Sequence, residues 1–316
     1  MGRGYAAKPI VHRRRSNPLW KVLAALLVVA VIACAGVSVY VGWSLSHAAK
    51  RPVDQNPAQV GLAYEPVEFA ATDGVRLSAW FIPSGDSSST IIVAHGYRSN
   101  RLSPSLPALE LARSLVEGGF NVLMFDFRNS GESDGDVTTL GYHEVKDVYG
   151  AVEWLAAQRP ERAEHIGLIG FSMGAATSIL ASANEPRIEA VIADSPFSDL
   201  RSYLSVNMPV WTGLPNFPFT WLIITLLPPL IGVDTDAVSP IAVVGSLPQP
   251  LLLIHTDGDG AIPSDESRRL FAAARPGRAE LWIVPGSTQH VGARRVDPAA
   301  YDARVIGFFR EAFGEN

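Results

Sequence analysis

The sequence has a single cysteine, Cys34, in 316 residues, so an intrachain disulfide is impossible. It also lacks a Cys-His cluster with metal-ligand spacing, a glycine-rich phosphate loop and a basic patch interleaved with aromatic residues. The run Asp257-Gly258-Asp259-Gly260 matches part of a calcium loop, but the third aspartate and the bidentate glutamate are missing. We therefore expect no metal, no cofactor and no nucleic-acid partner.

Acidic residues are absent from the first 51 positions, which hold eight of the 26 basic residues. The remainder of the chain carries 18 basic and 31 acidic side chains. Such an acidic domain repels nucleic acid and stays soluble. The charge distribution thus divides the chain into a short basic N-terminal part and a large acidic part.

A long uncharged run, Val22 to Leu45, separates the first basic residues from the rest. Its 24 residues can cross a hydrocarbon core of about 30 Å as a helix that rises about 1.5 Å per residue. A cleaved signal peptide has a shorter apolar region, so we interpret the run as a retained transmembrane anchor. Basic residues concentrate on its N-terminal side, which predicts a cytoplasmic tail at 1–21, a single crossing of the cell membrane and an extracytoplasmic domain.

Cys34 lies inside this run, where we expect it to act as a small hydrophobic side chain. The residues Val31-Ile32-Ala33-Cys34 also fit a loose lipobox, which would make Cys34 a lipidated N-terminus after cleavage. The apolar run continues for about ten residues beyond Cys34, where a lipoprotein turns polar. The unmodified membrane residue is therefore the favoured interpretation.

Residues 46–64 are polar and contain Pro52 and Pro57, so we expect an extended linker before a domain at 65–316. In that domain apolar runs typical of strands alternate with helix-like segments, a pattern that predicts an α/β fold with a mostly parallel sheet and helices on both faces. The expected strands are 67–70, 75–82, 121–125, 166–169, 188–193, 250–254 and 280–284, and the expected helices are 106–117, 143–158, 174–184, 265–274 and 299–313.

The motif Gly170-Phe171-Ser172-Met173-Gly174 follows one of these strands and opens one of these helices. In this context a Gly-x-Ser-x-Gly motif forms a sharp turn that lifts the serine hydroxyl above the sheet, and the glycines avoid a clash between the positions on either side. The Met173 N–H and the positive end of the helix would face charge that develops on a substrate oxygen. We therefore predict that Ser172 is a catalytic nucleophile and not a plain turn serine.

A carboxylate and a histidine follow Ser172 in the chain order that such a turn requires. The loop with Asp257 and Asp259 comes after the apolar strand at 250–254, and His290 comes after the next strand. Serine is a poor nucleophile until an imidazole accepts its proton, and the imidazole needs a carboxylate to fix its tautomer. We predict His290 as general base and then acid, with an aspartate of this loop as its partner.

These features resemble the alpha/beta-hydrolase superfamily, in particular its compact serine esterases, lipases and aminopeptidases. Three further segments carry the resemblance, which covers about residues 65–313: Ile91 to Tyr97, Asp126 to Ser133, and Ser239-Pro240 with Pro250 to His255. They are similar to the family's oxyanion-hole loop, its Asp-x-Arg-x-x-Gly-x-Ser loop and its approach to the acid strand. The resemblance implies the alpha/beta-hydrolase fold.

The resemblance also implies roles for individual residues. The family's acid falls four residues after a histidine that is similar to His255, which implies Asp259, although Thr256 stands where the family has glycine. Asp257 is the second choice for the acid, and Asp194, at the end of an earlier strand, is the third. The oxyanion hole would consist of the backbone N–H groups of Met173 and Tyr97.

Residues 203–233 interrupt the alternation of strands and helices with aromatic, proline and branched residues. The run at 221–231 is too short and too rich in proline for a second membrane span. A buried core helix is one interpretation, but hydrolases that resemble this chain insert a cap at this position. We expect a small apolar cap at about 200–235, suited to an acyl chain or to a membrane-facing entrance.

Together the observations predict a membrane-anchored serine hydrolase that cleaves a carboxylic ester, with a small or lipid-like acyl substrate and no cofactor. A serine peptidase would use the same residues and would need a carboxylate for a free amino terminus, which Glu185, Asp199 or Asp234 could supply. An acyltransferase would shield the acyl-enzyme from water. A non-catalytic anchored scaffold is the alternative of a different class.

Overall fold

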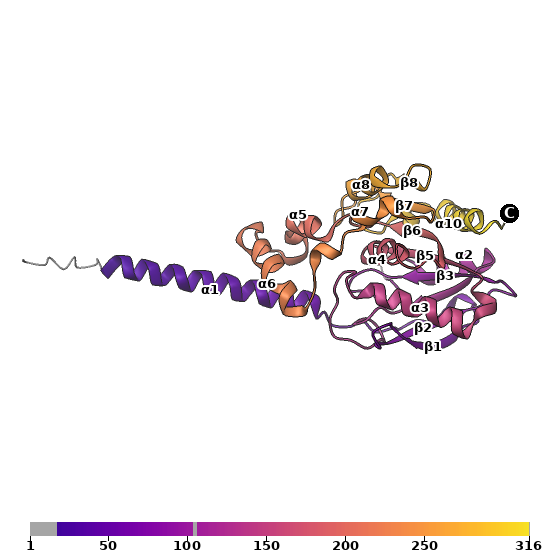
Figure 1. Cartoon of the computed structure of the whole chain (residues 1–316), viewed down its shortest axis with the longest axis horizontal. Helices are drawn as coiled ribbons and strands as arrows, with labels where there is room; N and C mark the ends of the chain where they lie inside the picture. Colours follow the sequence, from indigo (N-terminus) through magenta and orange to yellow (C-terminus); the bar gives the residue numbers. More distant parts are fainter. Residues whose placement is uncertain (1–17, 104–105, 316) are drawn as a thin grey trace, which may run out of the picture.

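A computed structural model describes residues 18–103 and 106–315, with an eight-stranded sheet at its centre (Figure 1). The strand order is β1-β2-β4-β3-β5-β6-β7-β8. The strands are β1 (Glu65–Ala70), β2 (Arg76–Ile82), β3 (Ser89–Ala94), β4 (Asn121–Phe125), β5 (His165–Phe171), β6 (Ile188–Asp194), β7 (Leu251–Thr256) and β8 (Ala279–Val284). β2 runs antiparallel to β1 and β4, and all other neighbours are parallel. The predicted mostly parallel sheet is confirmed.

Helices cover both faces of the sheet, as expected. One face packs against α2 (Ala108–Glu117), α9 (Ala293–Val296) and α10 (Pro298–Phe313), and the other against α3 (Glu144–Gln158), α4 (Met173–Ser182), α7 (Pro240–Val243) and α8 (Asp265–Ala273). Successive strand residues point to opposite faces, so Ile91 and Val93 join the core under α2 and α10, whereas Ile92 joins the core under α3 and α4. Burial on both faces explains the continuous apolar runs of the central strands.

Most element boundaries differ from the sequence expectations by one or two residues, and two of these differences have a clear local cause. The helix expected at 106–117 begins at Ala108, with Pro107 at its N-cap. The first strand begins at Glu65, two residues earlier than expected, because Glu65 pairs with Phe81 of the neighbouring strand. Its first residues are exposed, so no apolar pattern marks them in the sequence.

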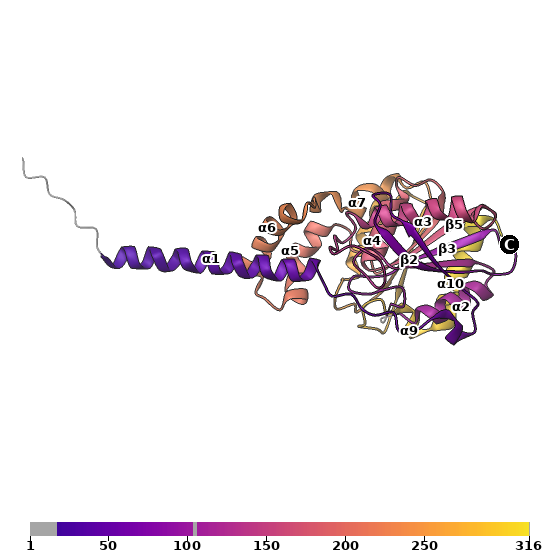
Figure 2. The same ribbon diagram turned by 90° about the horizontal axis from the view of Figure 1, so that it is seen from below.

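Helix α1 (Pro18–Ser46) contains the predicted anchor and projects from the sheet domain as a long rod (Figures 1 and 2). Among the described helices it is the one that is long and apolar enough by itself to cross a membrane. Its C-terminal end packs on α6 (Trp221–Ile231). A Cβ atom at Gly42 would lie 2.9 Å from Cδ2 of Leu227, so the glycine allows the two helices to approach closely. The predicted tail at 1–21 lies outside the described residues, apart from its last four.

Residues 47–64 connect α1 to the sheet domain in an extended course that ends in a short 3-10 helix, η1 (Pro57–Val60), and a turn. The segment lies on the domain surface and is not a free tether. Nζ of Lys50 donates a hydrogen bond to the carbonyl oxygen of Ser133 at 2.6 Å, and several apolar side chains of the segment pack against the sheet core. The end of α1 is therefore held close to the domain.

The segment predicted as a cap forms α5 (Leu200–Thr212), η3 (Asn216–Thr220) and α6. It lies at the end of the domain from which α1 projects (Figure 1). The two halves of this helix pair are bent by 108°, and by length and composition the pair also passes as a broken membrane span. Only Ile223 and Pro228 of α6 are buried, so α6 is not a core helix.

Candidate active site

Ser172 lies in the sharp turn between β5 and α4, where its backbone adopts φ 55° and ψ −117°. Residues other than glycine rarely adopt this conformation, and it stores strain. A Cβ atom at Gly170 would lie 2.2 Å from the carbonyl oxygen of Gly174, and a Cβ atom at Gly174 would lie 2.2 Å from that of Ala94. Both glycines of the motif are therefore needed for α4 to pack against the strands.

Ser172, His290 and Asp259 form one hydrogen-bonded chain. Nε2 of His290 lies 2.8 Å from Oγ of Ser172, and Nδ1 of His290 lies 2.7 Å from Oδ2 of Asp259. The three residues follow β5, β8 and β7, so the carboxyl ends of three parallel strands bring them together. Because Nδ1 donates to the carboxylate, Nε2 of the neutral ring can accept the serine proton.

The surroundings of Asp259 favour its charged form. Its Oδ1 accepts hydrogen bonds from the backbone N–H groups of Ala261 at 2.8 Å and Ile262 at 3.0 Å. Burial opposes ionisation, but hydrogen bonds from His255 and His290 outweigh it and hold the pKa of Asp259 well below its usual value. A charged Asp259 can orient the His290 ring and could stabilise an imidazolium at that position.

The second-choice acid, Asp257, precedes Asp259 in the same loop but is bonded elsewhere. Its Oδ1 accepts the backbone N–H of Gly286 at 3.1 Å, and its side chain is exposed. Among the carboxylates in the described part of the chain, Asp259 is the one that hydrogen-bonds His290. The structure therefore separates two candidates that the sequence places two positions apart.

The third candidate, Asp194, is buried at the end of β6 and supports the nucleophile turn. Its carboxylate accepts hydrogen bonds from Oγ of Ser195 at 2.8 Å and from the hydroxyl of Tyr301 at 2.9 Å. Burial raises the pKa of Asp194 to about 6. Its backbone carbonyl accepts the Ser172 N–H at 2.8 Å. Asp194 thus lies beside the site without contacting the histidine.

The two N–H groups predicted to bind an oxyanion lie beside the nucleophile. Met173 is the first residue of α4, so its N–H has no partner within the helix. A Cβ atom at Gly96 would lie 3.4 Å from Cβ of Ser172, so the loop that contains Gly96 and Tyr97 lies close to the Ser172 side chain. Within the described ranges, neither the Met173 nor the Tyr97 N–H donates to another protein group. Both can therefore donate to a substrate oxygen.

His95 fixes the orientation of the peptide that carries the Tyr97 N–H. Its Nε2 accepts the backbone N–H of Phe127 at 3.0 Å, so Nδ1 carries the proton and donates to the Gly96 carbonyl oxygen at 2.8 Å. This carbonyl and the Tyr97 N–H belong to one planar peptide and point in opposite directions. Burial lowers the pKa of His95 and so favours the neutral ring.

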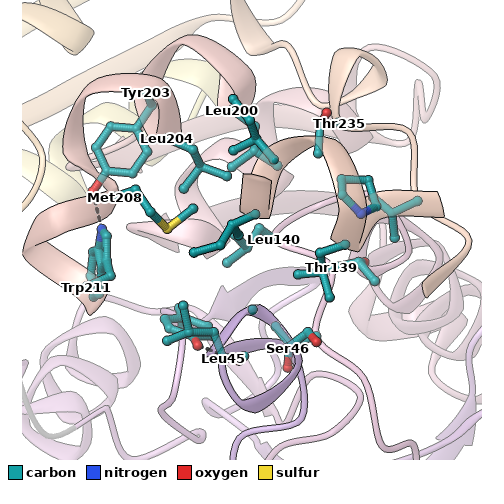
Figure 3. Close-up of a pocket in the computed structure, with 18 of the residues that line it drawn as sticks. Leu45, Ser46, Thr139, Leu140, Leu200, Tyr203, Leu204, Met208, Trp211 and Thr235 are labelled. Atoms are coloured by element: carbon teal, nitrogen blue, oxygen red, sulfur yellow. Dashed lines mark hydrogen bonds between the residues drawn. The ribbon is translucent and has the colours of Figure 1, made fainter. Parts of the chain in front are cut away.

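An apolar cavity lies next to Ser172 and Met173, with a volume of about 950 Å³ when its solvent-open part is included. Figure 3 shows that its walls come from the cap, from the loop before α3 and from the end of α1. The labelled wall residues are Leu45, Ser46, Thr139, Leu140, Leu200, Tyr203, Leu204, Met208, Trp211 and Thr235. None of the described lining residues carries a charge. This size and lining suit an acyl chain.

The end of α1 is the part of the cavity wall that the sequence does not predict. The hydroxyl of Tyr97 donates to the carbonyl oxygen of Leu45 at 2.5 Å across 52 residues of sequence. The backbone N–H of Thr138 donates to the carbonyl oxygen of Ser46 at 2.8 Å. Both bonds satisfy carbonyl groups that the helix end leaves open. Tyr97 itself also lines the cavity.

The three carboxylates considered for a free amino terminus are all bonded elsewhere. Glu185 pairs with the neighbouring Arg187 at 2.6 Å. Asp199 accepts a backbone N–H as the N-cap of α5, and Asp234 accepts one as the N-cap of the 3-10 helix at Thr235–Ala237. None of the three lines the cavity.

Comparison with known proteins gives matches over most of the chain. A family model described as X-Pro dipeptidyl-peptidase (S15 family) matches residues 73–219. YqkD of Bacillus subtilis (strain 168) is 31% identical over 216 residues, which cover 67% of this chain and 68% of YqkD. YfhR of Escherichia coli (strain K12) is 32% identical over 236 residues, which cover 72% of this chain and 74% of YfhR.

A solved structure extends the similarity to three dimensions. The esterase Pf2001 of Pyrococcus furiosus superposes with a TM-score of 0.69 at 30% sequence identity, and the match covers 83% of this chain and 97% of the esterase. Nearly the whole length of that esterase therefore has a counterpart here.

Proposed function

This chain is a member of the alpha/beta-hydrolase superfamily, and on that basis we propose that it cleaves carboxylic esters through an acyl-enzyme intermediate on Ser172. The fold predicted from the sequence and the assignment to the hydrolases are confirmed by the similarity to the Pyrococcus furiosus esterase. The observation that carries the proposal is the hydrogen-bonded chain from Ser172 through His290 to Asp259. Its position beside an apolar cavity supports a substrate with a small or lipid-like acyl group.

Acylation begins when Oγ of Ser172 attacks the ester carbonyl carbon and Nε2 of His290 takes the hydroxyl proton. Asp259 stabilises the resulting imidazolium. The substrate carbonyl oxygen becomes negative and accepts hydrogen bonds from the backbone N–H groups of Met173 and Tyr97. Each such donor contributes about 3 kcal/mol of transition-state stabilisation.

The tetrahedral intermediate then collapses, and His290 gives its proton to the leaving alkoxide, so that an alcohol departs. In the second half of the reaction a water molecule attacks the acyl carbon while His290 again accepts a proton. The carboxylic acid is released and the Ser172 hydroxyl is restored. One set of groups thus serves both half-reactions.

An ester substrate fits the cavity better than a peptide with a free amino terminus. The described lining residues carry no charge, and a buried ammonium group would need a carboxylate partner. Glu185, Asp199 and Asp234 do not supply one there. The match to the X-Pro dipeptidyl-peptidase model over residues 73–219 nevertheless makes a serine peptidase the second candidate.

Helix α1 supports a location at the cell membrane. Its side chains before the cap contact are mostly exposed and apolar, and basic residues concentrate on its N-terminal side. We place the N-terminus in the cytoplasm and the hydrolase domain outside. Reporter fusions at each end of α1 test this orientation: activity of an extracytoplasmic reporter fused before α1 would contradict it.

Labelling with a fluorophosphonate probe tests the nucleophile. The full chain in membranes should react, and Ser172→Ala should not; equal labelling of both would exclude Ser172. Ser178→Ala is the control and should still be labelled. Ser178 is a buried serine of α4 whose Oγ donates a hydrogen bond to the Gly174 carbonyl oxygen.

A substrate panel then separates the two candidate activities. Para-nitrophenyl esters of increasing acyl length are compared with aminoacyl-proline amides on the same preparation. We expect hydrolysis of the esters. A higher kcat/KM on the amides would replace the esterase proposal by the peptidase and leave the role of Ser172 unchanged.

A further inference from the structure

The cap exposes large apolar side chains to an unusual degree. Between Arg201 and Asp234 the sequence has no charged residue. On this stretch Phe217 is 83% exposed and Val206 is 70% exposed. The other exposed large apolar residues of the cap are Val210, Trp221 and Leu230. A group of exposed large apolar side chains on one segment is typical of contacts with a protein partner or a membrane.

The position of this surface next to α1 identifies its partner. Helix α1 contacts both α6 and η3, and the glycine at position 42 brings its backbone against Leu227 and Ile223. Figures 1 and 2 show the cap at the point where the exposed part of α1 leaves the domain. A bilayer crossed by α1 therefore has to meet the cap first.

The length of α1 sets the depth of the contact. About 20 residues span the hydrocarbon core, so a span that starts at Val22 reaches the far boundary close to Gly42. Tyr40 and Trp43 are exposed at this level of α1, and aromatic side chains of this kind are typical of the membrane interface. Trp221 opens the helix that packs against the same turns of α1.

We propose that the cap is a second membrane contact, in which α5, η3 and α6 lie in the interfacial zone of the leaflet around the end of α1. The cavity is walled by residues from both membrane-contacting parts, Gly42 and Leu45 of α1 and Ile223 and Leu227 of α6. The acyl chain of a membrane-resident ester enters the cavity from this leaflet and reaches Ser172 without crossing water. The entry of substrate rests on the proposed esterase function, whereas the contact with lipid does not.

Fluorescence quenching tests the lipid contact directly. Cys34 is the only cysteine, so Cys34→Ala provides a background for single labels in the full chain. Phe217→Cys carries an environment-sensitive fluorophore in phospholipid nanodiscs, and lipids with a nitroxide near the headgroup act as quencher. Phe271→Cys is the control, because Phe271 is 43% exposed and lies near the end of α8 that leads to the start of β8, whereas the candidate site lies at the carboxyl ends of the strands.

We expect several-fold stronger quenching at position 217 than at position 271. Equal and weak quenching at both positions would overturn the proposal. Weak quenching at position 217 together with two copies of the chain per nanodisc would show that a second copy covers the cap, which also overturns it.

Activity measurements test the route of the substrate. Val206→Glu with Phe217→Glu places two charges on the exposed cap surface without touching the cavity lining. Phe271→Glu with Val296→Glu is the matched control, because both residues are exposed and lie outside the cap. On para-nitrophenyl palmitate held in vesicles, the cap variant should lose at least about tenfold in rate because charged side chains leave the interface. On soluble para-nitrophenyl acetate all variants should match the unaltered chain.

An unchanged palmitate rate in the cap variant would overturn the entry route. If the unaltered chain hydrolyses neither ester, the esterase proposal fails, and the quenching experiment still decides the membrane contact. The two proposals are thus tested by separate readouts.

Discussion

The Asp259 carboxylate lies 2.7 Å from Nδ1 of His290, whereas the buried carboxylate of Asp194 is bonded to two hydroxyl groups, those of Ser195 and Tyr301. Asp259→Asn should therefore lower kcat by about 10⁴-fold, because the amide favours the wrong histidine tautomer. Steady-state kinetics on a soluble ester measures this loss.

Asp194→Asn is the matched comparison. Hydroxyl groups can rotate to donate to or accept from an amide, so this variant should stay within about tenfold of the unaltered kcat, a change of about 1.4 kcal/mol. A larger loss for Asp194→Asn than for Asp259→Asn would move the role of the acid to β6.

The backbone of Ser172 makes a second prediction, about stability. Its φ of 55° with ψ of −117° suits glycine, so Ser172→Gly should be more stable than Ser172→Ala by about 1 kcal/mol or more. Both variants lose the hydroxyl, so the difference reports the relief of strain less the entropy that the more flexible glycine loses on folding. Chemical denaturation of the two chains in detergent measures it.

Ser178→Gly and Ser178→Ala provide the control pair, because Ser178 lies in the interior of α4, the helix that Ser172 precedes. Here the order should reverse, with glycine about 1 kcal/mol less stable than alanine. If glycine is also the less stable residue at position 172, the turn is not strained.

The proposed nucleophile and the proposed base could be predicted from the sequence because their signals are local. Ser172 stands between two glycines at a strand-to-helix junction, and His290 follows the last apolar strand. Residue types alone do not distinguish Asp257 from Asp259, and only the family resemblance favoured Asp259. In the structure the N–H groups of Ala261 and Ile262 hold Oδ1 of Asp259, which leaves Oδ2 to bond His290. Residue types do not reveal this loop geometry.

The cavity wall could be predicted only in part. The cap was recognisable from its composition and from its place between two strands. The contribution of α1 was not, because a helix that reads as a membrane span carries no pattern that indicates which of its turns touch the domain. Gly42 is a residue of α1 whose type indicates a close helix contact, and only the structure shows that this contact is with Leu227 of α6.

His95 should act as a positioning residue for the oxyanion donor. His95→Gln removes the ring that binds the Gly96 carbonyl, so the peptide with the Tyr97 N–H loses its fixed orientation. We expect kcat to fall by about 10²-fold, up to the loss of one complete donor, with KM within a few-fold. If KM instead rises by about the same factor and kcat is unchanged, His95 acts in substrate binding.

The pH dependence of stability gives His95 a second readout. The ordinary pKa of a histidine is 6.5, and burial lowers the pKa of His95 below this value in the folded chain. Below pH 6.5 the unfolded chain therefore binds more protons than the folded chain, and the folded state loses stability. The loss should begin as the pH falls below 6.5 and reach at most about 1.4 kcal/mol per pH unit. His95→Gln cannot take up this proton. The free energy of unfolding of this variant should therefore depend less on pH below 6.5 than that of the unaltered chain. Identical pH profiles for both chains would contradict a buried neutral histidine.

Leu45 should help to set the acyl length that the cavity accepts. Its side chain lines the cavity from the end of α1, and its carbonyl oxygen is held by Tyr97. Leu45→Ala enlarges the space and should shift the preferred para-nitrophenyl ester to a longer chain, whereas Leu45→Trp should shift it to a shorter one. A single methylene in such a pocket changes kcat/KM by about tenfold to a hundredfold, so the profile over acyl length resolves the shift.

Leu23→Ala, on the exposed part of α1, is the control and should leave the profile unchanged. Parallel shifts in all three variants would mean that α1 acts through anchoring and not as a wall of the cavity.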